Sequence, residues 1–117
     1  MSSAINTSTS GIKAFQTKMN VIANNVANIN TDNFKKNRVF FKEGVDGGVQ
    51  TKIYKSNTAG HIRKEIEKGQ MVEKESSNVD MIEEVTESLP AQRGYEANLK
   101  MLKVHDEMLE NLLDITG

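Results

Sequence analysis

Apolar residues recur at alternating steps of three and four along the segment from Ser10 to Asn30. The members of this series are Ile12, Phe15, Met19, Ile22, Val26 and Ile29. Such heptad spacing is typical of a narrow apolar stripe on a helix that packs against a partner helix. We therefore predict that residues 1–9 are either loose or a frayed helix start, and that the helix proper begins with Thr9 or Ser10 as its N-cap and ends near Asn28–Asn30.

A second apolar pattern follows Ser77 and predicts a helix over residues 79–114. Its stripe comprises Val79, Ile82, Val85, Leu89, Leu99, Leu102, Leu109 and Leu113, and Met101, Val104, Met108, Leu112 and Ile115 widen it. Ser77 or Asn78 is expected to cap this helix, with Glu83 and Glu84 near its positive N-terminal end. A helix of that span is about 54 Å long at 1.5 Å per residue. A small chain cannot cover it, so part of its apolar face is expected to need an external partner.

Pro90 and Gly94 interrupt this second helical pattern. A proline inside a helix removes one backbone hydrogen bond and costs about 3 kcal/mol. We expect a kink near Pro90, either as a bend or as the meeting point of two helices.

Between the two helical patterns, residues 35–76 alternate in the manner of short strands. Asp46-Gly47-Gly48 is a strong hairpin signal, and Asn33 stands where a left-handed residue would end the first helix. We predict a mainly α fold in which long terminal helices pair as a coiled coil around a small, lysine-rich β element of two to four strands. The expected segments are residues 1–34, 35–76 and 77–117.

The composition leads us to expect that stability comes from assembly rather than from the single chain. Of the 117 residues 37% are apolar and 5% aromatic, which allows a modest core. The net charge of −1 does not imply a bulk attraction to nucleic acid or to an anionic membrane. Residues 35–74 carry ten Lys and Arg against five Asp and Glu, whereas residues 78–117 carry three against nine. These segments either attract each other, within one chain or between copies, or are two solvated faces.

Candidate catalytic and metal-binding residues are few. His105 and Glu110 are five residues apart and do not share a helix face, and His61 has no adjacent cluster, so ordinary surface histidines are expected. There is no cysteine, no glycine-rich phosphate loop before a helix and no nucleophile beside a base. We predict no enzymatic activity, no metal and no cofactor. No cleaved secretion signal and no apolar run of about 20 residues is found, so membrane insertion is not expected.

Two blocks of the sequence resemble the conserved ends of flagellar basal-body rod proteins. The N-terminal block is matched by Ala23, Asn24, Asn25, Ala27, Asn28, Thr31, Phe34, Lys35 and Arg38. The C-terminal block is matched by Asn78, Val79, Asp80, Glu83, Glu84, Gln92, Arg93, Tyr95, Glu96, Ala97 and Asn98. The blocks lie in the family's order and cover about two-thirds of the chain. Departures are Asn33, where the family usually has Gly, and Pro90 and Gly94, where it usually has helix formers.

The resemblance implies a structural subunit of the flagellar rod that polymerises through its terminal helices into the axial drive shaft. Its partners would be copies of itself, other rod subunits and the type III export apparatus, and its location would be the periplasmic rod of the basal body. The short middle is most similar to the proximal C-type rod subunit. The alternative is a soluble helical-hairpin binding or adaptor protein that uses the same apolar stripe.

We assign two sets of residues to assembly. The helix seam consists of Ile12, Phe15, Met19, Ile22, Val26, Ile29, Leu99, Leu102, Leu109 and Leu113. The candidate subunit contacts are Asn24, Asn25 and Asn28, whose amides suit polar contacts that set helix register, and Arg93, whose guanidinium is typical of interfaces.

Overall fold

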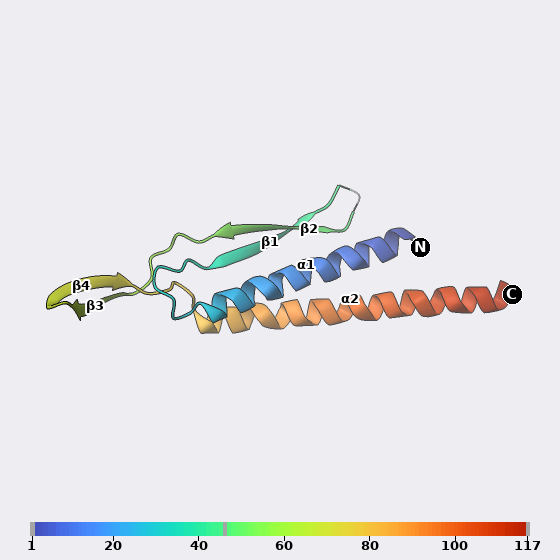
Figure 1. Cartoon of the computed structure of the whole chain (residues 1–117). Helices are drawn as coiled ribbons and strands as arrows, with labels where there is room; N and C mark the ends of the chain where they lie inside the picture. The colour runs from blue at the N-terminus through green and yellow to red at the C-terminus, as the bar shows by residue number, and fades with distance from the viewer. Residues whose placement is uncertain (1, 46, 117) are drawn as a thin grey trace.

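The computed structural model describes residues 2–45 and 47–116 and shows an elongated molecule of 82 × 24 × 20 Å. Its elements are α1 (Ser2–Ala27), β1 (Asn37–Glu43), β2 (Val49–Lys55), β3 (Ile62–Glu67), β4 (Gln70–Glu75) and α2 (Met81–Thr116). The two helices lie side by side with the chain termini at the same end of the molecule (Figure 1). The predicted fold class, mainly helical with a small β element, is confirmed.

The helices are antiparallel, as three contacts along their interface show. Gly11 of α1 lies against Asn98, Phe15 against Gly94, and Asn25 bonds to Glu84, so the position on α2 falls as the position on α1 rises. The terminal helices therefore pair as expected. The regular knobs-into-holes packing of a coiled coil stays a prediction.

α1 begins before the predicted N-cap at Thr9 or Ser10, so residues 2–9, predicted to be either loose or a frayed helix start, are helical. The helix already runs from Ser2, and Ser8 is buried within it. The Thr9 hydroxyl donates to the carbonyl of Ile5 at 2.8 Å inside the helix, so Thr9 is not a cap. At the other end α1 stops at Ala27, and Asn33 adopts a φ of 62°, the left-handed conformation that the sequence predicted.

α2 continues through Pro90 as a single helix of 36 residues, so the alternative of two helices meeting at that residue is wrong. A bend at Pro90 stays a prediction. The cap is also displaced from the expected Ser77 or Asn78: the Asp80 carboxylate accepts from the Ile82 N–H at 3.0 Å. The acidic first turn, with Glu83 and Glu84, is as predicted.

The middle of the chain forms two antiparallel hairpins, in agreement with the predicted two to four strands. In the first, Phe40 faces Lys52, and the turn contains Gly47 and Gly48 at positive φ; the Asp46 of the predicted turn lies outside the described residues. In the second, Lys68 and Gly69 form the turn at positive φ.

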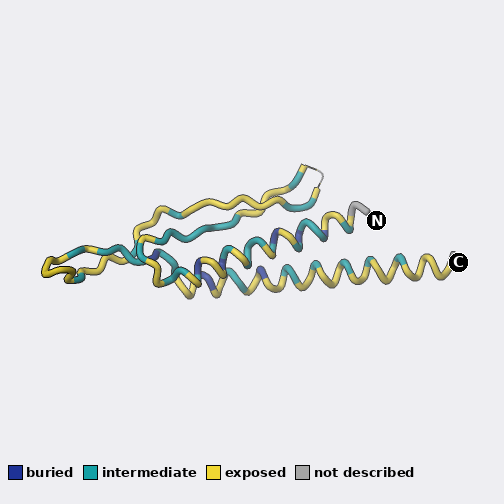
Figure 2. The backbone as a smooth tube through the Cα atoms, in the orientation of Figure 1, coloured by how far each residue is buried: buried dark blue, intermediate teal, exposed yellow. Residues whose placement is uncertain are grey.

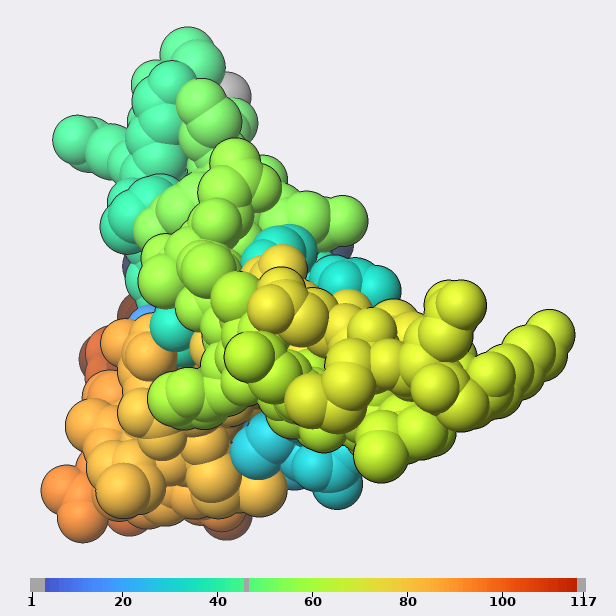
Figure 3. Space-filling model, turned by 90° about the vertical axis from the view of Figure 1, so that its left-hand side faces the viewer, coloured from blue at the N-terminus to red at the C-terminus, as the bar shows by residue number. Residues whose placement is uncertain are grey.

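The two hairpins relate differently to the helices. The β1–β2 hairpin packs on α1, where the Phe15 and Phe41 rings meet edge to face at 5.0 Å and the Ser10 hydroxyl accepts from the Val49 N–H at 3.0 Å. The β3–β4 hairpin projects beyond the helices, and no described residue of these two strands packs against either helix (Figure 1). Figure 3 views the molecule from the end that carries the β3–β4 hairpin. In this view the β1–β2 hairpin lies at the top, the β3–β4 hairpin at the right and α2 at the lower left.

The core is small and lies between α1 and the first half of α2 (Figure 2). Among the described residues the buried apolar side chains are Ala14, Ile22 and Ala91. The seam residues of α1 are all buried or half-buried, whereas in α2 Leu102 and Leu109 are half-buried and Leu99 and Leu113 are exposed. The second half of α2 therefore has no buried apolar residue among those described.

α2 turns small and polar residues toward α1, and this orientation was not predicted. Its buried positions are Glu84 and Ala91, with Gly94 and Asn98 against α1. At about 100° per residue, Ile82, Val85 and Leu89 lie on the opposite face. Their exposed fractions of 78%, 50% and 54% show that the apolar stripe points outward. We call Ile82, Val85 and Leu89 the outer stripe.

Candidate functional site

A buried polar junction joins α1, β1 and the first turn of α2. Asn25 and Glu84 are its centre, and both are 0% exposed. The Asn25 amide nitrogen donates to both carboxylate oxygens of Glu84, at 3.2 Å each. A buried carboxylate is costly unless it is paired and hydrogen-bonded, so Glu84 needs these partners.

Asn25 also holds the start of β1. Its side-chain nitrogen donates to the Asn37 carbonyl at 2.9 Å, and its oxygen accepts from the Asn37 N–H at 3.0 Å. This pair of bonds repeats the pattern of a β-ladder, so the amide acts as a neighbouring strand one residue long. A single asparagine therefore connects a helix, a strand and a buried acid.

Arg38 supplies the positive charge of the junction. Its guanidinium contacts Glu84 at 2.8 Å and also pairs with Glu83. Glu83 in turn accepts from the Lys36 ammonium at 2.9 Å. Lys36, just before β1, and Arg38, within it, thus reach the two consecutive carboxylates in the first turn of α2. The hydrogen bond from Lys36 and the interaction with Arg38 hold the pKa of Glu83 below its ordinary value.

Asn78 closes the junction where the chain returns from the hairpins. Its side-chain oxygen accepts from the Lys36 N–H at 2.7 Å, and its nitrogen donates to the Thr58 carbonyl at 2.8 Å. Its own N–H donates to the Phe34 carbonyl at 3.2 Å. One residue therefore clamps the segments that leave α1 and enter α2.

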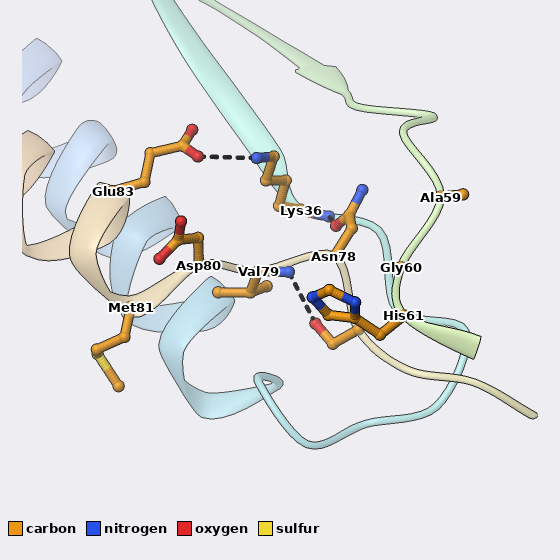
Figure 4. Close-up of a pocket in the computed structure, with 10 residues that line it drawn as sticks. Lys36, Ala59, Gly60, His61, Asn78, Val79, Asp80, Met81 and Glu83 are labelled. Carbon is orange, nitrogen blue, oxygen red and sulfur yellow. Dashed lines mark hydrogen bonds and ion pairs between the residues drawn. The ribbon is translucent and has the colours of Figure 1, made fainter. Parts of the chain in front are cut away.

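A hollow of about 460 Å³ lies beside this clamp, between the start of α2 and the loop before β3 (Figure 4). It is lined by Lys36, Ala59, Gly60, His61, Ser77, Asn78, Val79, Asp80, Met81 and Glu83. Lys36 and Glu83 bind each other across it. Within residues 2–45 and 47–116 no three His, Asp or Glu side chains are placed to hold a metal ion. None of the helices in this described part is long and apolar enough to cross a membrane.

The predicted subunit contacts separate into two groups. Asn25 does not lie on a surface: its side chain is fully buried, and its bonds are made within the chain, so its prediction as a subunit contact fails in this structure. Asn24 and Arg93 are exposed, and Asn28 is half-buried with its amide bonded to the Asn24 carbonyl at 2.9 Å. Their role between subunits stays a prediction.

The sequence reasoning missed the pairing of Arg38 with Glu83 and Glu84. In the sequence these residues belong to two separate blocks, and the position of the two acids is explained by the favourable interaction with the helix dipole. The sequence does contain one signal for this pairing: basic residues begin the first strand, acidic residues begin the second helix, and the two hairpins lie between them. The sequence reasoning also missed the role of Gly94, which interrupts the helical pattern in the sequence and is the place where the Phe15 ring meets α2 in the structure.

Acid is expected to weaken the junction through Glu83. Because its folded-state pKa is depressed below 4.5, Glu83 contributes stability above that value and loses it as the pH falls through the lower, folded pKa. We expect urea unfolding midpoints between pH 7 and pH 3 to fall less steeply for Glu83→Gln than for the unaltered chain. Glu107→Gln, an exposed position far along α2, is the control; an equal flattening by both variants would refute the assignment.

Comparisons with known proteins match both ends of this architecture. A family model described as flagella basal body rod protein matches residues 5–35, and one described as flagellar basal body rod FlgEFG protein C-terminal matches residues 69–115. The chain is 64% identical over 36 residues to the flagellar basal-body rod protein FlgG of Bacillus subtilis (strain 168), which is 31% of this chain and 14% of that protein. It is 45% identical over 40 residues to the flagellar hook protein FlgE of Borreliella burgdorferi (strain ATCC 35210 / DSM 4680 / CIP 102532 / B31), which is 34% of this chain and 9% of that protein.

The matched regions contain the two helices, the β4 strand and four of the junction residues, Asn25, Asn78, Glu83 and Glu84. The fold and the family models together place the chain among flagellar structural proteins, and in this chain two terminal helices enclose an inserted β segment. Within this class, the chain belongs to the flagellar basal-body rod protein family. It is a component of the basal body of the flagellum.

Proposed function

We propose that this chain is a structural subunit that polymerises through its helices into the axial rod of the flagellum. The observation that carries the proposal is the outward direction of the outer stripe. Ile82, Val85 and Leu89 are spaced as the seam of a helix pair, yet they face away from α1. A stripe of this kind is buried when another subunit packs against it.

The second half of α2 supports the same conclusion. Its exposed large apolar residues include Met101, Val104, Met108 and Ile115, with exposed fractions of 45% or more. Their spacing of three, four and seven places them on one face, which is turned away from the outer stripe by roughly a quarter of a helical circumference. α2 thus presents apolar surface in two directions, as a helix between several neighbours requires.

The finer parts of the proposal are export and subunit type. A core of few buried apolar residues favours a chain that is readily unfolded, which suits passage through the type III export apparatus. The short middle segment supports the proximal C-type rod subunit, whereas the two relatives compared above are named flagellar basal-body rod protein FlgG and flagellar hook protein FlgE. Copies of this chain and other rod subunits are the proposed partners.

The double variant Ile82→Glu/Val85→Glu tests the outer stripe. Each side chain is at least half exposed, so the fold is expected to stay intact, with unchanged circular dichroism. Burying such a side chain between subunits is worth about 1.5–3 kcal/mol, so the two changes should weaken association by a hundredfold or more. Static light scattering against concentration measures this.

Gln16→Glu on the exposed side of α1 is the matched control, because it adds a carboxylate outside the stripe. A chain that stays monomeric at millimolar concentration, or a double variant that associates as strongly as the unaltered chain, would refute the proposal.

Deleting the gene distinguishes the proposed rod subunit from the alternative of an adaptor protein. Loss of a rod subunit abolishes filaments and motility, whereas loss of an adaptor leaves some flagella.

A further inference from the structure

One face of the β1–β2 hairpin is both aromatic and basic. The Phe40 and Tyr54 rings stack at 4.6 Å with an angle of 9° between their planes, and both remain exposed. Lys42 and Lys52 share their side of the sheet, because alternate residues of a strand point the same way and Phe40 faces Lys52. Phe41 points to the other side, toward Phe15. We call Phe40, Lys42, Lys52 and Tyr54 the basic aromatic face.

The C-terminal half of α2 has the complementary character. Asp106, Glu107, Glu110 and Asp114 make its end acidic, and its last turn contains no basic residue. None of the ion pairs found in residues 2–45 and 47–116 includes these four acids. Asp114 lies in the last turn of α2, where the partial negative charge of the helix end makes an acid unfavourable unless a cation approaches from elsewhere. Next to them lies the exposed apolar surface of Met101, Val104 and Met108.

These two surfaces do not meet within one molecule. α1 packs against both the β1–β2 hairpin and α2 and lies between them (Figure 1). The hairpin's aromatic pair lies near Lys18 of α1 and near Glu83 and Glu87 at the start of α2, whereas the acidic residues lie toward the opposite end of α2. Within one chain the basic middle meets the acidic C-terminal arm at the junction, where Lys36 and Arg38 pair with Glu83 and Glu84, whereas the acids near the end of α2 make no ion pair among the described residues.

We propose that the basic aromatic face of one copy binds the acidic C-terminal half of α2 of a second copy, an inference that rests on the proposed function. Phe40 and Tyr54 would cover the apolar residues of the partner helix, and Lys42 and Lys52 would pair with its Glu107 and Asp114. Those two acids are seven residues apart, on one side of the helix and about 10 Å from each other. The apolar contact supplies affinity, and the charges set which surfaces meet.

The contact has a defined symmetry consequence. It joins two different surfaces, so each copy offers one hairpin and one helix end, and a third copy adds in the same way as the second. Heterologous contacts that do not close into a ring generate open helical filaments. The proposed contact thus gives the assembly a direction, which the outer stripe alone does not.

Charge reversal on each side tests the contact with the full chain. We expect Lys42→Glu/Lys52→Glu to weaken association by about tenfold, and Glu107→Lys/Asp114→Lys to do the same. Equal amounts of the two variants, mixed, should associate as strongly as the unaltered chain, because every hairpin then meets a helix end of opposite charge. Sedimentation velocity at low and high salt measures all three samples, and circular dichroism checks that each variant is folded.

The mixing step distinguishes a contact between copies from one within a chain, which mixing cannot restore. Lys13→Glu/Lys64→Glu, at exposed lysines outside the basic aromatic face, controls for overall charge and should leave association within about twofold. If the unaltered chain associates but mixing restores nothing, or the control weakens association equally, the contact is wrong while the proposed function stands. If the unaltered chain does not associate at all, the proposed function itself fails.

Discussion

Replacing Arg38 with alanine is expected to lower the free energy of unfolding by about 3–5 kcal/mol, the range found when one partner of a buried ion pair is removed. Glu84 is fully buried, and the Arg38 guanidinium at 2.8 Å is its cationic partner. Without Arg38, the carboxylate keeps the Asn25 amide but loses its counter-charge. Urea unfolding followed by circular dichroism at pH 7 measures the loss.

Arg63→Ala provides the matched control. Arg63 also contacts two acids, Asp32 at 2.8 Å and Glu65 at 2.7 Å, but its side chain is 42% exposed. Exposed ion pairs are worth about 0–1 kcal/mol, so this variant should unfold nearly as the unaltered chain does. Equal losses for both arginines would show that the burial of Glu84 is not what makes the junction strong.

Gly94→Ala is expected to destabilise the helix pair by about 1–3 kcal/mol, although alanine is the better helix former by about 1 kcal/mol. A Cβ at position 94 would lie 2.3 Å from the Phe15 ring. That ring is also held edge to face by Phe41, so it cannot move aside without breaking the contact between α1 and the β1–β2 hairpin. Thermal unfolding of the variant should begin at a lower temperature.

Gly11→Ala is the counterpart on α1. A Cβ there would meet the Asn98 side chain at 3.0 Å, and that flexible amide can shift. The gain in helix propensity should then leave stability unchanged or slightly higher. If both glycine variants are more stable than the unaltered chain, the Phe15 ring does not need the space at Gly94. The described packing of Phe15 against α2 would then be incorrect.

The sequence predicted the elements of this fold better than their orientation. Heptad spacing located both helices, and the glycine turns located the hairpins, because these signals depend on local backbone geometry. The face of α2 that meets α1 could not be found in this way. Apolar periodicity shows which side of a helix is buried in the final assembly, and in α2 the outer stripe is not the side that its own chain covers.

The junction was hidden for a related reason. Asn25 was predicted as a surface contact because asparagine is polar, and Glu84 was assigned to the helix dipole. Their burial depends on Arg38 and Asn37, which come from another part of the chain. Pairing over 59 residues between Asn25 and Glu84 has no local signature. The family resemblance marked these residues, but the contacts among them required the three-dimensional structure.

The clamp at Asn78 makes the middle of the chain modular. The chain leaves the helix pair after Phe34 and returns at Asn78, and a backbone hydrogen bond of 3.2 Å joins these two points. Since the junction also uses Lys36, Asn37 and Arg38, an insert that keeps these residues begins and ends at the same place, and its length does not alter how the helices meet. A longer or shorter insert of this kind would therefore keep the same two-helix base.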